Sequence, residues 1–156
     1  MAKRTAQSVA PFQGKDLALH FAWGGGFFED ADLATVRPGV KRDLAVASGI
    51  DNFTQAVANR LKTRQGELAS LGHPTYGSRH HELIGEPNVP RVRNLIKLYI
   101  LQALRDDPRI ERVLRADVLA EHDPPRDSVR IELQVQVTGA PTPLNLVVPF
   151  SLGVGV

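Results

Sequence analysis

The side chains that could carry catalysis or bind a metal ion are few and widely spaced along the chain. His80 and His81 form the only close histidine pair, and the chain contains no His-Glu-x-x-His motif. Adjacent residues of a helix or strand point in different directions, so we do not expect this pair to share a metal ion. The absence of cysteine excludes a thiolate nucleophile, a disulfide scaffold and a cysteine-ligated zinc site. We therefore predict no metal site.

Two other segments contain residues used in nucleotide-binding loops or in serine hydrolases, a glycine run and a serine in a tight turn. Gly24-Gly25-Gly26 is followed neither by Gly-Lys-Ser/Thr nor by a helix pattern, so we interpret it as a turn. Ser78 stands in Tyr76-Gly77-Ser78-Arg79, which lacks the Gly-x-Ser-x-Gly pattern of a nucleophilic serine. We expect Ser78 to be the N-cap of a short helix over residues 79–84.

A glycosidase would need two carboxylates that face one cleft. The candidates match by residue type only, and they are Glu67, Glu82, Glu86, Asp106 and Asp107. Glu67 directly follows Gly66 in a predicted loop, where a role in stabilising the turn is favoured over a role as catalytic acid. We therefore predict no catalytic residue and no cofactor.

The composition is that of an ordinary globular protein. The chain has 156 residues, of which 42% are hydrophobic and 23% charged, with a net charge of +2. No apolar run reaches the ~20 residues of a membrane span, and no secretory signal follows the basic N-terminus. Arginine outnumbers lysine fourteen to five, which interface chemistry and a GC-rich genome explain equally well. Acidic residues lie among the basic ones and aromatics make up only 6%, so we do not expect nucleic-acid binding.

Apolar residues recur at helical spacing in two segments. The first predicts a helix of about 12 residues, with Asp51 as N-cap and an apolar face of Ile50, Phe53, Val57 and Leu61. The second starts at Pro90, whose missing N–H costs nothing in a first turn, and ends at Asp106-Asp107-Pro108. Its apolar face consists of Val92, Leu95, Ile96, Tyr99, Ile100, Ala103 and Leu104. Between the two helices, residues 63–79 are predicted to form a structured loop.

The C-terminal half has the period of β-strands. Apolar residues alternate with polar ones over residues 129–137 and again over residues 144–150, across a turn at residues 139–143. Residues 110–119 form a third, less regular candidate strand. Three successive strands with short turns predict an antiparallel meander, and two helices on one face make an α+β fold. We expect residues 151–156 to be a flexible tail.

Residues 1–42 differ from the rest and are predicted to form an N-terminal arm, attached to a domain over residues 43–150. The arm holds Trp23 and four of the six phenylalanines, including Phe27 and Phe28, and is too apolar for a solvated linker. Alternation over residues 17–23 predicts a short strand, and residues 43–47 predict another. We expect the arm to pack on the domain or on a neighbouring subunit. No internal repeat is apparent along the chain.

A series of motifs over residues 43–150 resembles the phage baseplate assembly protein W family, the small wedge subunits of contractile tails and contractile injection systems. The motifs are Ser48–Ala56, Arg60–Leu68, Pro74–Ser78 and Asp107-Pro108-Arg109-Ile110, followed by alternating strands. The resemblance marks six structural positions, namely Gly49, Gly66, Glu67, Tyr76, Gly77 and Ser78. The family's Glu-Pro-Arg motif corresponds here to Asp107-Pro108-Arg109.

The resemblance implies a structural subunit without enzymatic activity, assembled in the cytoplasm into a baseplate. Its expected partners are larger wedge subunits, the sheath protein and tube or hub proteins, with several copies in a ring of six or a multiple. The expected partner-binding residues are Asp107, Pro108, Arg109, Trp23, Phe27 and Phe28. Arg109 could hold a partner's carboxylate or carbonyl groups bidentately. The alternative is an intramolecular pair between Arg109 and an aspartate that fixes the corner.

Two functional alternatives stay open. Some relatives have been labelled lysozymes, so a peptidoglycan-hydrolysing enzyme is the second interpretation. The sequence also leaves open whether the machine is a phage tail, a tailocin or a phage-derived injection particle.

Overall fold

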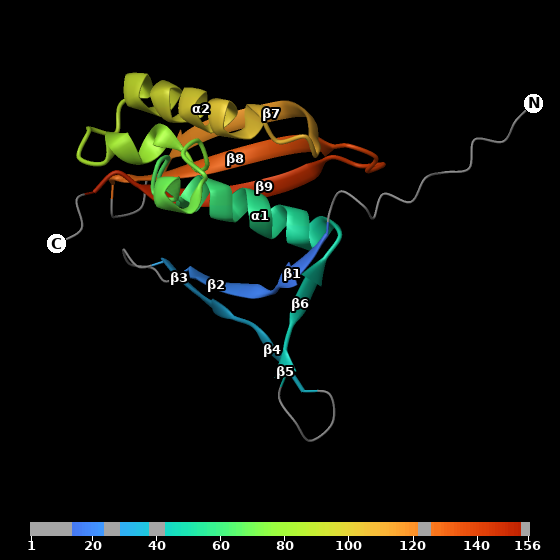
Figure 1. The fold of residues 1–156 in the computed structure, drawn as a ribbon. Coiled ribbons are helices and arrows are strands. Elements are labelled where there is room, and N and C mark those ends of the chain that lie inside the picture. The colour runs from blue at the N-terminus through green and yellow to red at the C-terminus, as the bar shows by residue number, and fades with distance from the viewer. Residues whose placement is uncertain (1–13, 24–28, 38–42, 122–125, 154–156) are drawn as a thin grey trace, which may run out of the picture.

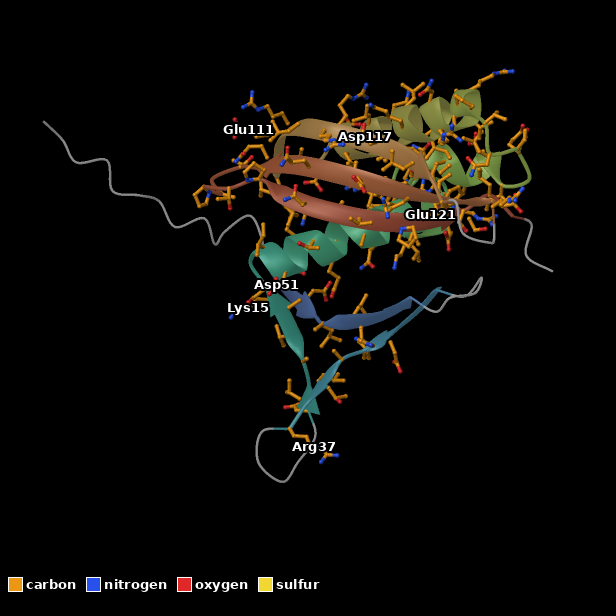
Figure 2. All side chains as sticks on the ribbon, turned by 180° about the vertical axis from the view of Figure 1, so that it is seen from behind. Lys15, Arg37, Asp51, Glu111, Asp117 and Glu121 are labelled. Carbon is orange, nitrogen blue, oxygen red and sulfur yellow. The ribbon has the colours of Figure 1, made fainter. Side chains whose placement is uncertain are left out.

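A computed structural model describes residues 14–23, 29–37, 43–121 and 126–153 of the chain (Figure 1). Its C-terminal half is a three-stranded antiparallel sheet in the order β7-β8-β9, made of Ile110–Ala120, Ser128–Val137 and Leu144–Ser151. Val135 stands opposite Val113 on one side and Leu144 on the other. The predicted meander is therefore confirmed, and register shifts near residues 110–115 mark irregularities in β7.

Helices α1, Ile50–Lys62, and α2, Pro90–Arg105, cover one face of this sheet (Figure 1). The core joins the apolar faces of the two helices to the alternate residues of β8 that point toward them. Its fully enclosed members include Phe53, Ile96, Ile100, Leu104, Val129, Ile131 and Val135. The α+β fold class predicted from hydrophobic periodicity is confirmed, since both periods bury their apolar residues in one core.

Helix α1 starts two residues earlier than predicted. Its N-cap is Gly49, with a φ of 60°, and Asp51 lies inside the first turn, so the predicted Asp51 cap was wrong. An aspartate in the first turn still has a favourable position beside the partial positive charge of the helix N-terminus. By contrast, α2 begins with Pro90 in its first turn and ends at Arg105, as predicted.

The segment between the helices contains two short 3₁₀ turns, η2 at Ala69–Leu71 and η3 at Arg79–Leu83. Ser78 is the N-cap residue of η3, although its side chain makes no capping hydrogen bond. At the other end of the chain, Ser151 closes β9 and Leu152 is buried, with its N–H bonded to Asp127 O at 2.8 Å. The flexibility of residues 151–156 stays a prediction, and residues 154–156 lie outside the described part of the chain.

The N-terminal part forms three two-stranded antiparallel ladders. They pair β1 (Lys15–Leu17) with β6 (Val46–Ser48), β2 (Leu19–Trp23) with β3 (Glu29–Leu33), and β4 (Thr35–Val36) with β5 (Asp43–Leu44). The predicted strands over residues 17–23 and 43–47 are present, each broken in two. Figure 1 shows the ladders beside α1, with β4 and β5 pointing away from the helices and the sheet. The predicted domain boundary at residue 42 stays a prediction. Strand pairing crosses it, since β5 pairs with β4 and β6 pairs with β1.

Candidate functional site

The corner between α2 and β7 is built around the carboxylate of Asp107, whose side chain is only 2% exposed. The Arg109 backbone N–H donates to Asp107 Oδ1 at 3.0 Å, and the guanidinium donates from Nε to Oδ1 at 2.9 Å and from Nη2 to Oδ2 at 2.7 Å. This is a bidentate arginine–carboxylate pair, the strongest geometry available to these two groups. The ion pair joins the two residues on either side of Pro108 and so fixes the corner. Pro108 itself is exposed, and its ring makes the corner more rigid because it restricts φ.

A second guanidinium extends the cluster. Arg60 Nη2 lies 3.9 Å from Asp107 Oδ2, and Arg60 Nη1 donates to Ala103 O at 3.2 Å. Burial alone would raise the pKa of Asp107, but the hydrogen bonds from Arg109 and the charges of Arg109 and Arg60 outweigh it and lower that pKa. The hydrogen bond to Asp107 raises the pKa of Arg109 in turn. The cluster is therefore charged on both sides and links α1, α2 and β7.

Aromatic rings flank both guanidiniums. The Arg109 guanidinium carbon lies 5.1 Å from the centre of the Phe53 ring, and that of Arg60 lies 4.8 Å from the Tyr76 ring. Both are cation–π distances. Burial raises the pKa of Tyr76, against the opposing charge of Arg60. Tyr76 thus belongs to the same cluster as Asp107 and Arg109, an association that their separation in sequence concealed.

The structure bears on the two interpretations of Arg109. Its bidentate side is bound to Asp107 within the same chain, and its side chain keeps 22% of its exposure. The intramolecular pair is therefore present. Contact between a partner and Asp107, Pro108 or Arg109 stays a prediction, and Pro108 is the most exposed of the three.

The remaining predicted structural positions shape the loop that supports this corner. Glu67 Oε2 accepts a hydrogen bond from the Arg64 N–H at 3.0 Å, so its carboxylate stabilises the turn over residues 64–67, which contains Gly66 with a φ of 88°. Gly77 has a φ of 99°, and a Cβ there would lie 2.6 Å from Thr63 O. Only glycine fits that backbone conformation and that space.

Next to this loop, the buried imidazole of His80 and the half-buried imidazole of His81 form a cluster that the sequence analysis did not predict. The His80 and His81 rings lie 4.2 Å apart, and His80 meets the Phe150 ring edge-on at 4.5 Å. His80 Nδ1 is 2.8 Å from Ser78 Oγ, and His81 Nε2 donates to Leu61 O at 2.9 Å. The expectation that the two side chains point apart was wrong, because the 3₁₀ turn brings both rings onto Phe150.

Protonation of this cluster is unfavourable. Burial, together with the charge of His81, lowers the pKa of His80 to about 3. Burial also lowers the pKa of His81. Both rings are therefore neutral near pH 7. In the described part of the chain, no three histidine, cysteine, aspartate or glutamate side chains are grouped to hold a metal ion.

The three ladders join the arm to residues 43–48 and meet at a junction made by three copies of one tripeptide. Asp-Leu-Ala occurs at residues 16–18, 32–34 and 43–45. The three alanines close a ring of backbone hydrogen bonds, each 2.8 Å long, from Ala18 N to Ala45 O, from Ala45 N to Ala34 O and from Ala34 N to Ala18 O. The chain therefore does contain an internal repeat, which three residues at unequal spacing concealed.

Each repeat has the same local geometry. The leucine N–H of every copy donates to Oδ1 of its own aspartate, at 2.7 Å in Asp16-Leu17 and Asp32-Leu33 and at 2.8 Å in Asp43-Leu44. We call the ring and its three Asp-Leu-Ala corners the strand junction. Since each ladder contributes one strand from each of two corners, the junction has approximate threefold symmetry in its connections.

Gln55 of α1 ties the strand junction to the domain. Its buried side-chain amide accepts a hydrogen bond from Leu19 N at 2.8 Å and donates to Leu17 O at 2.9 Å, on either side of Ala18. The amide thus pairs with the Leu19 N–H and the Leu17 C=O as the backbone of a neighbouring strand would. A groove of about 490 Å³ lies beside this contact, between the arm, α1 and residues 145–148 of β9.

The predicted aromatic contacts of the arm lie largely beyond what the structure describes. Trp23 is the last residue of β2, opposite Glu29 of β3. Phe27 and Phe28 lie outside the described residues, so their proposed burial against a neighbour stays a prediction. Among the described residues, no helix combines the length and apolarity needed to span a bilayer.

Comparison with known proteins gives a match in structure and none in sequence. No family model matches the chain, and no curated protein does. A candidate tail lysozyme from Geobacter sulfurreducens, solved by crystallography, is similar with a TM-score of 0.58 and 23% identity. The similarity covers 67% of this chain and 92% of that protein. At this identity the match establishes that the two share a fold.

Proposed function

We propose that the chain is a structural wedge subunit in the baseplate of a contractile tail or contractile injection machine. In this role it binds larger wedge subunits around the tube and templates the first sheath ring. It assembles in the cytoplasm, in several copies per ring, and needs no cofactor. The resemblance over residues 43–150 and the shared fold with a candidate tail protein support this assignment.

The observation that carries the proposal is the arm. Two-stranded ladders are marginally stable in water by themselves, and these three add few apolar residues to the core. Instead they leave Leu17, Leu33, Val36, Leu44 and Val46 exposed. Exposed apolar residues gathered in one segment are typical of an interaction site. A segment of this kind suits a subunit that is completed by its neighbours.

The sheet offers a second contact. β9 pairs with β8 on one side, and none of the described strands pairs with its other edge. An extended segment of a sheath subunit could add to this edge through main-chain hydrogen bonds. The adjacent groove would accept side chains of such a segment, because β9 residues 145–148 form one of its walls.

Co-purification tests the assignment. The full chain, with a C-terminal affinity tag, is co-expressed with the larger wedge subunit and the sheath protein encoded in the same gene cluster. We expect at least one of them to be retained through size-exclusion chromatography. If both are soluble and neither is retained, the wedge assignment is wrong. The same assignment predicts sheath, tube and spike genes beside this one.

A peptidoglycan hydrolase is the second candidate, because the similar solved structure is described as a candidate tail lysozyme. Clearing of a peptidoglycan suspension by the wild-type protein, and its loss in Glu67→Gln, would support an enzyme. We expect no clearing, since the Glu67 carboxylate is engaged by the Arg64 N–H in an exposed turn.

A further inference from the structure

Two arginines of the described chain combine a stacked aromatic ring with a bidentate carboxylate. The Arg79 guanidinium carbon lies 4.8 Å from the centre of the Tyr99 ring, and its Nε and Nη2 donate to the two Glu82 oxygens at 3.0 and 2.9 Å. Arg109 also lies over a ring and is held bidentately by Asp107. In both cases a carboxylate of the same chain neutralises the stacked cation.

Arg60 has the ring but lacks a carboxylate of its own. Its guanidinium carbon lies 4.8 Å from the centre of the Tyr76 ring. In the described part of the chain its side chain makes one hydrogen bond, from Nη1 to Ala103 O. Asp107 Oδ2 is 3.9 Å from Arg60 Nη2, beyond hydrogen-bonding distance, and it already accepts from Arg109 at 2.7 Å. One carboxylate therefore serves two guanidiniums.

The charged side chains at the corner between α2 and β7 leave a surplus of one positive charge. They are Arg60, Arg105, Arg109, Asp106 and Asp107. Arg105 and Asp106 form a separate exposed pair, whereas Arg60 and Arg109 keep only 19% and 22% of their exposure. A largely enclosed charge is unfavourable unless a group of opposite sign accompanies it. The last carbonyls of α2 offset part of this surplus, and a carboxylate from outside the chain would offset the rest.

The Tyr76 hydroxyl is a second donor beside Arg60. Burial raises the pKa of Tyr76 and the charge of Arg60 acts against it, so the hydroxyl lies close to that guanidinium and keeps its proton near pH 7. No described residue hydrogen-bonds to this hydroxyl. Both side chains are partly exposed, so an acceptor from outside can reach them.

We propose that Arg60 and Tyr76 bind a carboxylate of the larger wedge subunit, carried by an aspartate or glutamate side chain. This inference rests on the proposed function and names the partner's chemistry at this corner. The guanidinium supplies the opposite charge and the hydroxyl supplies a further hydrogen bond, while Arg109 stays bound to Asp107. The sheath contact proposed above lies at the free edge of β9. The corner adjoins β7, at the opposite edge of the sheet, so it is left for the wedge subunit.

A matched pair of tyrosine variants tests the site. Tyr76→Phe removes the hydroxyl and keeps the ring that stacks on Arg60. The control, Tyr99→Phe, makes the same change at the ring that stacks on Arg79, whose carboxylate is already present. Each variant is titrated with the purified wedge subunit by calorimetry, and its midpoint of urea unfolding is measured in parallel.

We expect Tyr76→Phe to weaken binding about tenfold, the loss of one hydrogen bond to a charged acceptor. Tyr99→Phe should change it less than about twofold. Both should unfold at the wild-type midpoint, because neither hydroxyl hydrogen-bonds to a described residue. Equal effects of the two variants on binding, or a Tyr76→Phe loss explained by a lower midpoint, would overturn the proposed site.

Two variants of Arg60 test the charge. Arg60→Gln removes it, and Arg60→Lys keeps it without the planar fork of donors. We expect Arg60→Gln to weaken binding at least about thirtyfold and Arg60→Lys to weaken it less. The unfolding midpoint of Arg60→Gln should fall far less than that of Asp107→Asn, because the Asp107–Arg109 pair stays intact. Equal binding by the two Arg60 variants would show that charge plays no part and would overturn an acidic ligand.

The outcomes separate this inference from the proposed function. If the wedge subunit is retained and Tyr76→Phe and Arg60→Gln both bind it as wild type does, the inference fails and the proposed function stands. If neither wedge nor sheath protein is retained, the proposed function itself fails. A self-association of the chain alone that Arg60→Gln abolishes, measured by sedimentation, would replace the wedge subunit with a second copy.

Discussion

Replacing Asp107 by Asn should lower the stability of the protein more than any other charge-removing change at the helix–strand corner. The substitution keeps the shape of the side chain but leaves Arg109 and Arg60 facing an uncharged group in a nearly closed site. Removing one partner of a fully buried pair costs about 3–5 kcal/mol. Because both guanidiniums keep about a fifth of their exposure, we expect a smaller cost, about 2–4 kcal/mol. For a chain of this size that corresponds to a fall of roughly 5–15 °C in Tm.

The neighbouring residue provides the control. Asp106 pairs with Arg105, but the two side chains are 72% and 75% exposed. Asp106→Asn should leave the midpoint of urea unfolding unchanged within error, because exposed pairs contribute little. Equal losses in the two variants, or no loss in Asp107→Asn, would refute the role given to the buried cluster. Arg109→Met added to Asp107→Asn should cost less than the sum of the two single changes.

The acid dependence of stability gives an independent check. The pKa of Asp107 is lowered on folding, so its contribution is present above the pKa of the unfolded chain, near 4. It is lost as the pH falls through the folded pKa. The difference in the free energy of unfolding between wild type and Asp107→Asn should therefore be constant above about pH 5 and shrink below pH 4.

Two further predictions concern the neighbouring loop. The folded pKa of His80, about 3, lies below the ordinary value of 6.5, so the free energy of unfolding should fall as the pH drops from 6.5 toward 3. One proton accounts for at most about 1.4 kcal/mol per pH unit. His80→Gln should flatten this slope in urea titrations, and an unchanged slope would mean that other groups cause it. Gly77→Ala should lower the free energy of unfolding by about 2 kcal/mol or more, since its Cβ would collide with Thr63 O. Gly72→Ala has a φ of 87° but open space around its Cβ, so it should lower the same quantity by about 1 kcal/mol. Equal losses in the two variants would contradict the collision.

Hydrophobic periodicity was sufficient to predict the two helices and the three-stranded sheet. The seven apolar positions of α2 and the alternation of β8 each bury one face, so their patterns report the core directly. The start of α1 was misplaced because Gly49 caps the helix through its backbone conformation, which residue type does not encode. Asp51 has the side chain of a cap but lies inside the first turn.

The contacts that a pattern could not predict are those between distant segments. Asp107 and Arg109 are close in sequence, and their pairing was one of two interpretations. Arg60 and Tyr76 join them only because α1 and the loop after it fold over the corner. The strand junction was missed for another reason. A tripeptide repeated at unequal intervals has no period, and the hydrogen-bonded ring that joins its three copies forms only in the folded chain.

The closed ring of the strand junction has a consequence for how the arm can vary. Each of its three hydrogen bonds joins two different corners, so no corner can be lost without opening the ring for the other two. All donors and acceptors of that ring are backbone groups of Ala18, Ala34 and Ala45, so a change of side chain along β2, β3, β4 or β5 removes none of them. A change that displaces one of the three alanines, by contrast, opens the ring. The ladders can therefore differ in sequence while the point from which all three start is kept.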